Sequence, residues 1–338
     1  METPTGGTVK TTQPMATFNE IQASLSTPLR QLNDIIADML HSESALTNEI
    51  VESYLRVKGK QLRPMLALLS GQFFGEITEQ VLYGAAAIEL LHNASLIHDD
   101  VIDQARERRG RATINSVWDN HVAVLIGDFF VTAALRCAVK ANDPRVLEML
   151  ANMGRNLSLG EINQVDVARN HNINEATYMQ IISAKTASLF ESCIAIGGYA
   201  VGADEKSLSH LRRYAGLLGI CFQIKDDIFD YFDDPIVGKP TGNDLREGKV
   251  TLPLIHTLSR TDLPEHDEMT ALVHKDQLSE QEINKLVEWA KQNGGIDYAY
   301  ATMERLRQEA DQLLDHYPDN PTTPTFKQIF SFIIKRNK

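Results

Sequence analysis

Apolar residues recur at intervals of three and four positions along most of this chain, which is the period of an amphipathic helix. The period is clearest in the stretches Glu79–Ile97, Trp118–Lys140, Val146–Ala168, Glu175–Ala200 and Lys206–Phe232. Alternation of apolar and polar residues, which would indicate strands, is almost absent. The pattern therefore predicts an all-α protein built from many helices.

Capping residues and helix breakers mark the ends of these stretches. Asp143, Asn174 and Asp204 each stand just before a helical stretch, where a side-chain oxygen can accept hydrogen bonds from the free N–H groups of the first turn. Because no shift in composition marks a domain boundary, we expect one domain over residues 17–338 after a flexible tail over residues 1–16. The breakers between the stretches are Gly59, Gly75, Gly110, Gly202 and the Pro/Gly-rich interval Asp233–Gly248.

The charge balance argues against nucleic acid as a partner. The 338 residues include 33 Lys+Arg and 45 Asp+Glu, a formal net charge of −12, whereas a nucleic-acid groove needs clustered basic residues. The three cysteines, Cys137, Cys193 and Cys221, are widely spaced and indicate neither a disulfide framework nor a zinc site.

Apolar runs are too short to predict a membrane span. The longest runs without charge, such as Met65–Gly75 and Tyr214–Ile224, fall well below the roughly 20 residues that a spanning helix needs. The first sixteen residues lack the apolar centre of a secretory signal. We therefore expect no transmembrane segment and a cytoplasmic location.

Two acidic clusters share the pattern Asp-Asp-x-x-Asp, at Asp99–Asp103 and at Asp226–Asp230. On a helix, the first and last aspartates of each cluster project from one face, about 6 Å apart along the axis. One such cluster alone is most often a solvated helix end. Here both clusters end strongly apolar segments, where carboxylates repel one another and oppose the helix dipole, so two of them indicate a compensating cation.

The chemistry of the clusters favours Mg²⁺. Hard carboxylate oxygens without accompanying cysteines suit this ion, which commonly shares its shell with substrate phosphates. An EF-hand fits poorly because neither cluster has the glycine and downstream glutamate of that loop. The two clusters therefore indicate a diphosphate held through magnesium.

Basic segments accompany both clusters, as an anionic substrate requires. Each is ordinary by itself: a solvated turn, a surface loop, or a lysine whose stem lies along a helix. Their joint occurrence around two aspartate clusters is what indicates diphosphate binding. The segments are Lys58–Pro64, Arg106–Thr113, Lys185-Thr186 and Gly238–Pro253.

Seven ordered motifs resemble those of the trans-prenyltransferases, the head-to-tail isoprenyl diphosphate synthases, from about residue 28 to residue 335. They are GKxxRP at Gly59–Pro64, HNASLIHDDVID at His92–Asp103, RRGxxT at Arg108–Thr113, GExxQ at Gly160–Gln164, KTAxLF at Lys185–Phe190, FQIKDDIFD at Phe222–Asp230 and GKPTGNDLREGKVTLP at Gly238–Pro253.

The resemblance implies a fold, a reaction and an assembly. The fold is a single-domain bundle of antiparallel helices around a deep cavity, usually in a homodimer. The reaction ionises an allylic diphosphate, adds isopentenyl diphosphate to the carbocation and removes a proton, with two or three Mg²⁺ ions in each active site.

The resemblance also implies roles for individual residues. The metal ligands would be Asp99, Asp103 and Asp226, with Asp100 and Asp230 supporting them directly or through water. The allylic diphosphate would be held by Arg108, Lys185, Gln223 and Lys239, and isopentenyl diphosphate by Lys60, Arg63, His92 and Arg109. Lys249 would add a phosphate contact, and the carbocation would face the carbonyl groups of Lys185 and Thr186 and the side chain of Gln223.

This chain departs from the family pattern near its first basic segment. Lys58 stands where a glycine is usual, and Gln61 replaces a frequent arginine. These departures bear on the isopentenyl diphosphate pocket.

Side chains on the helix before the first cluster are expected to set product length. In the family the ruler lies at the fourth and fifth residues before the motif, here Ser95 and Ala94. Both are small, which favours a medium or long all-trans chain of octaprenyl type, suited to a quinone side chain. Phe129 or Phe130 is a candidate floor of the tunnel, and simple core packing is an equal alternative for both.

Other functions remain open at this stage. A shorter-chain geranylgeranyl or farnesyl synthase has the same motifs. A non-catalytic regulatory subunit typically loses one aspartate motif, and a class I terpene cyclase has a different second metal motif.

Overall fold

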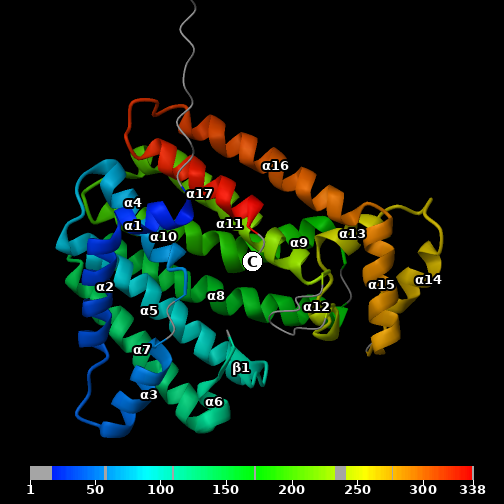
Figure 1. Ribbon diagram of the computed structural model, residues 1–338, viewed down its shortest axis with the longest axis horizontal. Coiled ribbons are helices and arrows are strands. Elements are labelled where there is room, and N and C mark those ends of the chain that lie inside the picture. The colour runs from blue at the N-terminus through cyan, green and yellow to red at the C-terminus, as the bar shows by residue number, and fades with distance from the viewer. Residues whose placement is uncertain are drawn as a thin grey trace, which may run out of the picture.

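The computed structural model describes residues 17–56, 59–108, 110–170, 173–232, 241–275 and 277–336, with the side chains of residues 164–170 left out. The described residues form helices throughout, apart from one hairpin of two short antiparallel strands, β1 (Glu107–Arg108) and β2 (Arg111–Ala112). Figure 1 shows the helices gathered into one bundle. The all-α prediction is confirmed.

The helices, in chain order, are α1 (Phe18–Ser24), α2 (Ser26–Met39), α3 (Ala45–Leu55), α4 (Leu62–Phe74), α5 (Glu79–Ile102), α6 (Ile114–Val117), α7 (Asn120–Lys140), α8 (Pro144–Asn170), α9 (Glu175–Ile182), η1 (Ser183–Ala187), α10 (Ser188–Tyr199), α11 (Glu205–Phe229), α12 (Asn243–Arg246), α13 (Leu252–Leu258), α14 (His266–Val273), α15 (Glu280–Gln292), α16 (Gly295–Leu314) and α17 (Thr323–Lys335).

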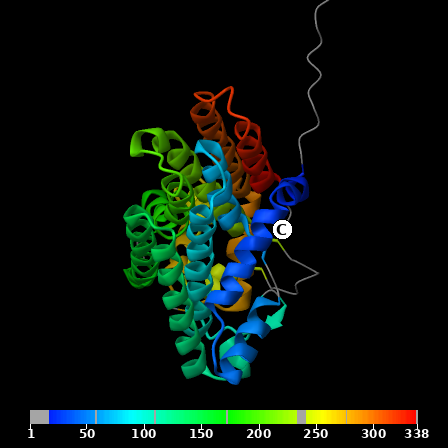
Figure 2. The same ribbon diagram turned by 90° about the vertical axis from the view of Figure 1, so that its left-hand side faces the viewer.

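The centre of the bundle is built from long helices that lie side by side. Helix α5 packs along α7, and α10 packs between α4 and α11. Turned by 90°, the bundle shows the blue helix α2 running alongside the teal helices α5 and α7 (Figure 2). Helix α17 packs against α11 and α16, and its C-terminal end lies beside α11 (Figure 1).

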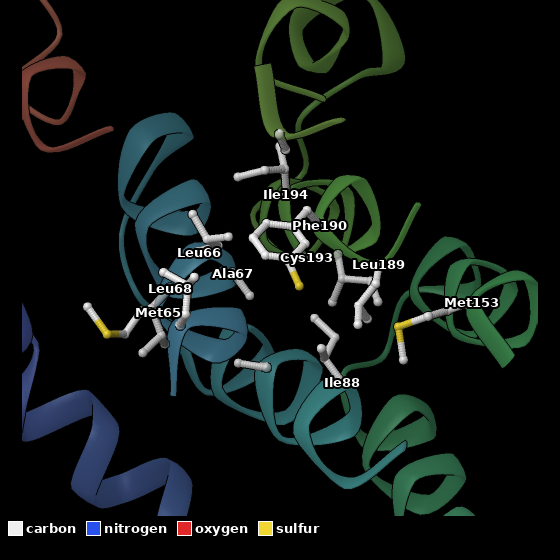
Figure 3. Packing of buried hydrophobic residues seen from close by; sticks show 14 of the residues in the cluster. Met65, Leu66, Ala67, Leu68, Ile88, Met153, Leu189, Phe190, Cys193 and Ile194 are labelled. Carbon is white, nitrogen blue, oxygen red and sulfur yellow. The ribbon is translucent and has the colours of Figure 1, made fainter. Parts of the chain in front are cut away.

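Side chains from four helices interlock in the core. Met65 and Leu66 on α4, Ile88 on α5, Met153 on α8 and Cys193 on α10 are fully buried together (Figure 3). Burial of one such side chain stabilises the fold by about 1.5–3 kcal/mol. All three cysteines are buried and unpaired with one another, so they act as small apolar core residues.

The predicted caps start the helices as expected. Asn174 accepts a hydrogen bond from the N–H of Thr177 at 2.9 Å, and Asp204 accepts one from the N–H of Ser207 at 2.7 Å. The stretch predicted as one helix over Glu175–Ala200 is interrupted, however. Residues Ser183–Ala187 form a π-helical turn, η1, which carries Lys185 and Thr186.

Two glycines make room for this π-helical turn. A Cβ on Gly160 of α8 would lie 3.1 Å from Lys185 Cβ, and a Cβ on Gly219 of α11 would lie 2.6 Å from Ala187 Cα. Real Cβ atoms essentially never show a contact as short as the one at Gly219, and the contact at Gly160 would be tighter than most, so η1 packs closely between α8 and α11 because both positions are glycine.

Helix α7 is apolar on more than its inner face. Among the described helices it alone is long and apolar enough to cross a membrane, and 44% of its most apolar window is buried inside the bundle. Its outer face still exposes Leu125 (67%) and Val139 (65%). The outward apolar side chains are therefore left uncovered in the isolated chain.

Candidate active site

The first aspartate motif (Asp99–Asp103) lies at the C-terminal end of α5. Asp99 is half-buried in the last turns of the helix, and Asp103 is its C-cap. Asp100 is buried and accepts a hydrogen bond from Arg108 Nε at 2.7 Å. The β1–β2 hairpin that follows the motif thus folds back and neutralises one of its three carboxylates.

The second aspartate motif (Asp226–Asp230) lies at the C-terminal end of α11. Asp226 forms an ion pair of 2.5 Å with Arg336, just beyond α17. Asp227 is buried and accepts hydrogen bonds from Tyr178 Oη at 2.6 Å and from Gln223 Nε2 at 2.8 Å. Asp230 accepts the backbone N–H groups of Asn243 and Asp244, each at 3.0 Å, at the start of α12.

The π-helical turn supplies the polar groups between the two motifs. Thr186 Oγ1 donates a hydrogen bond to Gln223 Oε1 at 2.8 Å, and the amide of Gln223 then donates to Asp227. Lys185 forms an ion pair with Glu161 of α8, and the charges of both residues act on Asp99. The three predicted catalytic residues therefore lie together, connected to both motifs.

A cavity of about 160 Å³ gathers these groups. Both lysines that line it are ion-paired: Lys185 with Glu161, and Lys249 with Glu247 at 2.5 Å. The charge of Lys185 also lowers the pKa of Asp99 in the first motif. Asp227 of the second motif also lines the cavity. Its charged and amide-bearing lining residues are Asn174, Lys185, Gln223, Asp227, Asp244 and Lys249.

Burial and mutual repulsion raise the pKa of several carboxyl groups here. Burial and the charge of Glu161 raise the pKa of Asp99 to about 6. Burial raises the pKa of Asp227 to about 6 despite its two hydrogen bonds, and burial with the charges of Asp227 and Asp230 raises the pKa of Asp244 to about 8. The site therefore has a surplus of negative charge that a cation would relieve.

The donor set fits a hard divalent cation. The carboxylates of both motifs offer oxygen ligands, and none of the three cysteines lies among them. Within the described parts of the chain, no three acidic, histidine or cysteine side chains converge closely enough to hold a metal ion by themselves. A divalent ion at this site would thus take part of its shell from water or substrate phosphate.

Of the residues predicted to bind isopentenyl diphosphate, the structure describes three and leaves one outside the described residues. Lys60 and Arg63 lie at the start of α4, and their charges act on Asp226. The pKa of Lys60 is lowered by burial and then by the charge of Arg336, so three cations crowd this corner. His92 is buried on α5, 8% exposed. Arg109 lies outside the described residues, as does Lys239 of the predicted allylic diphosphate site.

The residues predicted to set product length lie on α5 and α7. Ala94 is buried, and Ser95 is half-buried with its hydroxyl bonded to His92 O at 2.8 Å. Phe130 is fully buried and packs edge-on against Tyr54, with ring centroids 5.5 Å apart. Phe129 is half-buried against the same core. Their roles as ruler or floor stay predictions.

Two charged partners in the site were not predicted from the sequence. Arg336 is 8% exposed, packs on Phe222 at 4.2 Å from the ring centroid, and pairs with Asp226. Glu161 pairs with Lys185. The basic C-terminal residues and the GExxQ motif were the available signals, but neither reveals which distant residue it meets.

Comparisons with known proteins agree with this geometry. The family model described as polyprenyl synthetase matches residues 44–290. Heptaprenyl diphosphate synthase component 2 from Bacillus subtilis is 34% identical over 298 residues, 88% of this chain and 84% of that relative. Octaprenyl diphosphate synthase from Escherichia coli is 33% identical over 308 residues, 91% of this chain and 93% of that relative.

Solved structures show the same arrangement. A decaprenyl diphosphate synthase from Rhodobacter capsulatus superposes with a TM-score of 0.88 at 30% identity, over 95% of this chain and 100% of that one. A polyprenyl synthase from Caulobacter crescentus, solved with calcium and isoprenyl diphosphate, has a TM-score of 0.88 at 28% identity over 97% of this chain and 100% of that one. The chain therefore belongs to the polyprenyl synthetase family of prenyltransferases.

Proposed function

We propose that this enzyme is a Mg²⁺-dependent, cytoplasmic trans-prenyltransferase that condenses isopentenyl diphosphate with an allylic diphosphate to make a medium- or long-chain polyprenyl diphosphate. The observation that carries the proposal is the cavity that Lys185, Lys249, Gln223 and Asp227 of the second motif line together, with the charge of Lys185 acting on Asp99 of the first motif. One small anion can therefore contact elements that are distant in sequence.

The basic residues stabilise the leaving group. Lys185 and Lys249 line the cavity, where a low dielectric would strengthen the effect of their positive charges on the negative charge that grows as the carbon–oxygen bond breaks. Arg108 and Lys239 add to this set by resemblance. Bound Mg²⁺, two or three ions held by Asp99, Asp103 and Asp226 with Asp100 and Asp230 in support, would supply further positive charge to the diphosphate oxygens.

The opposite charge, on the allylic carbon, needs dipoles and not a nucleophile. The Thr186 hydroxyl and the Gln223 amide are bonded to one another in a fixed chain that ends on Asp227. These two hydrogen bonds hold the Gln223 oxygen and the carbonyl groups of η1 in place before substrate arrives. Electrostatic catalysis requires such preorganisation.

We expect the side chains on α5 just before the first motif to set product length. Ala94 and Ser95, the residues just before the first motif, carry small side chains instead of aromatic ones, which supports a longer product. Relatives named as octaprenyl synthases at 33% identity support this, whereas the geranylgeranyl diphosphate synthase of Sulfolobus acidocaldarius, 30% identical over 331 residues, supports the shorter alternative.

We propose a homodimer as the working form, on the apolar outer face of α7 and the adjacent α8. A component of a two-part synthase is the second candidate, because one relative is named component 2 of its enzyme. A homodimer of this chain would be active alone, whereas a component of a two-part synthase would need its partner.

The experiment is to incubate the purified chain with Mg²⁺, isopentenyl diphosphate and farnesyl diphosphate and to size the products by chromatography. We expect chains longer than geranylgeranyl. Asp99→Ala and Asp226→Ala should lower turnover by about two orders of magnitude or more with an unchanged helical circular dichroism spectrum, and Asp262→Ala, on an exposed loop, is the matched control. No product from the wild-type chain, or full activity of either variant, contradicts the proposal.

A further inference from the structure

The GExxQ motif places its glutamate against the lysine of the KT motif, and no role in the proposed reaction has yet been given to it. Gly160 is buried where α8 packs against Lys185 of η1, and Glu161, the next residue, forms an ion pair with Lys185. Both side chains keep about a third of their surface exposed, 33% for Glu161 and 31% for Lys185. The pair is thus fixed at the edge of the cavity and not sealed in the core.

Lysine needs such a partner more than arginine would. Its ammonium is a point charge on a flexible four-carbon stem, whose free rotamers must be restricted before it can hold one position. The backbone at Lys185 is already fixed, because Gly160 and Gly219 clamp η1 from two sides. Only the side chain remains to be oriented, and Glu161 on the neighbouring helix α8 pairs with it.

The paired lysine belongs to the cavity wall. Lys185 lines the cavity of about 160 Å³ together with Thr186, Gln223 and Asp227, while its ammonium is paired with Glu161. Glu161 therefore restrains the Lys185 ammonium at the cavity in which the allylic diphosphate of the proposed reaction would bind.

We infer that Glu161 is a positioning residue that holds Lys185 for the allylic diphosphate. It acts through Lys185 and touches no reacting atom. The inference rests on the proposed function, since it assigns Glu161 to the allylic half of that reaction and not to the isopentenyl half, which the cations around Asp226 serve.

The experiment compares Glu161→Gln, which removes the charge and keeps the shape, with Glu288→Gln, which breaks a surface ion pair with Lys291 on α15. For Glu161→Gln we expect KM for farnesyl diphosphate to rise about tenfold, with KM for isopentenyl diphosphate changed less than twofold. Glu288→Gln should match the wild type. A wild-type KM for farnesyl diphosphate in Glu161→Gln overturns the inference.

A second measurement separates orientation of Lys185 from a general effect of charge. Binding of inorganic pyrophosphate with Mg²⁺ is measured by calorimetry in Glu161→Gln, in Lys185→Met and in the double variant. If Glu161 acts only through Lys185, the double variant binds as Lys185→Met does. A further loss of affinity in the double variant overturns the inference.

Two additions keep the test decisive. If Glu161→Gln is unstable by circular dichroism, Glu161→Asp replaces it: its carboxylate is one methylene shorter, so we expect an intermediate KM, and a wild-type KM overturns the inference. A wild-type chain that makes no product would reject the proposed function, whereas an active wild type with an unaffected Glu161→Gln rejects the positioning role alone.

Discussion

Asp99 and Asp227 hold their protons more tightly than ordinary aspartates do, because partial or full burial and neighbouring carboxylates disfavour their ionised forms. Their pKa values are raised from 3.8 to about 6 in the folded, metal-free chain. The folded state therefore binds protons more readily than the unfolded state between these values, and its stability falls as pH rises through about 6. A bound divalent cation reverses this preference, since it binds the ionised carboxylates.

We accordingly predict that Mg²⁺ stabilises the protein more at about pH 7.5 than at about pH 5, where protons compete for the same oxygens. The measurement is the Mg²⁺-induced rise in Tm at the two pH values. In Asp99→Asn the difference between them should shrink. An equal rise at both pH values in the wild type would show that these carboxyl groups do not bind the ion.

The sequence predicts which residues belong to the site, but it does not predict which distant residues pair with them. The two motifs, Lys185 and Gln223 were named from the sequence and lie around one site. Arg336 was not predicted, since its partner Asp226 is 110 positions away and the pairing depends on where α17 ends. Local spacing carries no information about such a contact.

At the scale of elements, the π-helical turn η1 is the feature that periodicity missed. A period of three and four residues predicts one continuous helix from Glu175 to Ala200, and the single wide turn over Ser183–Ala187 barely alters that pattern. Its cause lies in the neighbouring helices, where Gly160 and Gly219 open the space that η1 occupies. The glycines are visible in the sequence, but their meaning requires the packing.

Gly219→Ala should therefore damage the site. Its Cβ would lie 2.6 Å from the backbone Cα of Ala187, so either η1 or α11 must move. We expect a loss of about 1–3 kcal/mol in the free energy of unfolding and a lower kcat, because Thr186 and Lys185 move with η1. The measurements are urea denaturation and steady-state turnover.

Gly154→Ala is the matched control for that substitution. It also lies within a helix, α8, but its Cβ would meet only Leu91 Cδ2, at an ordinary 3.7 Å. Alanine is the better helix former by up to about 1 kcal/mol, so this variant should be as stable as the wild type or more stable. Equal stability of the two variants would mean that η1 is not clamped as described.

At the scale of the whole molecule, the outer face of α7 is the largest feature that the isolated chain leaves unexplained. Leu125 and Val139 are separated by almost four helical turns and so share one face, and both are about two-thirds exposed. Ile162 of the adjacent α8 is 62% exposed as well. Exposed apolar side chains that share one side of the molecule are typical of an interaction surface, and the proposed homodimer would cover them.

We predict that Leu125→Glu separates this dimer, because a charge buried at an interface without a partner opposes association. Light scattering after size-exclusion chromatography should give the dimer mass for the wild type and the monomer mass for the variant. Leu46→Glu is the control, since Leu46 on α3 is also exposed, at 52%, and the added charge is the same. A monomeric wild type would reject the dimer. A Leu125→Glu variant that stays dimeric while Leu46→Glu dissociates would place the interface elsewhere.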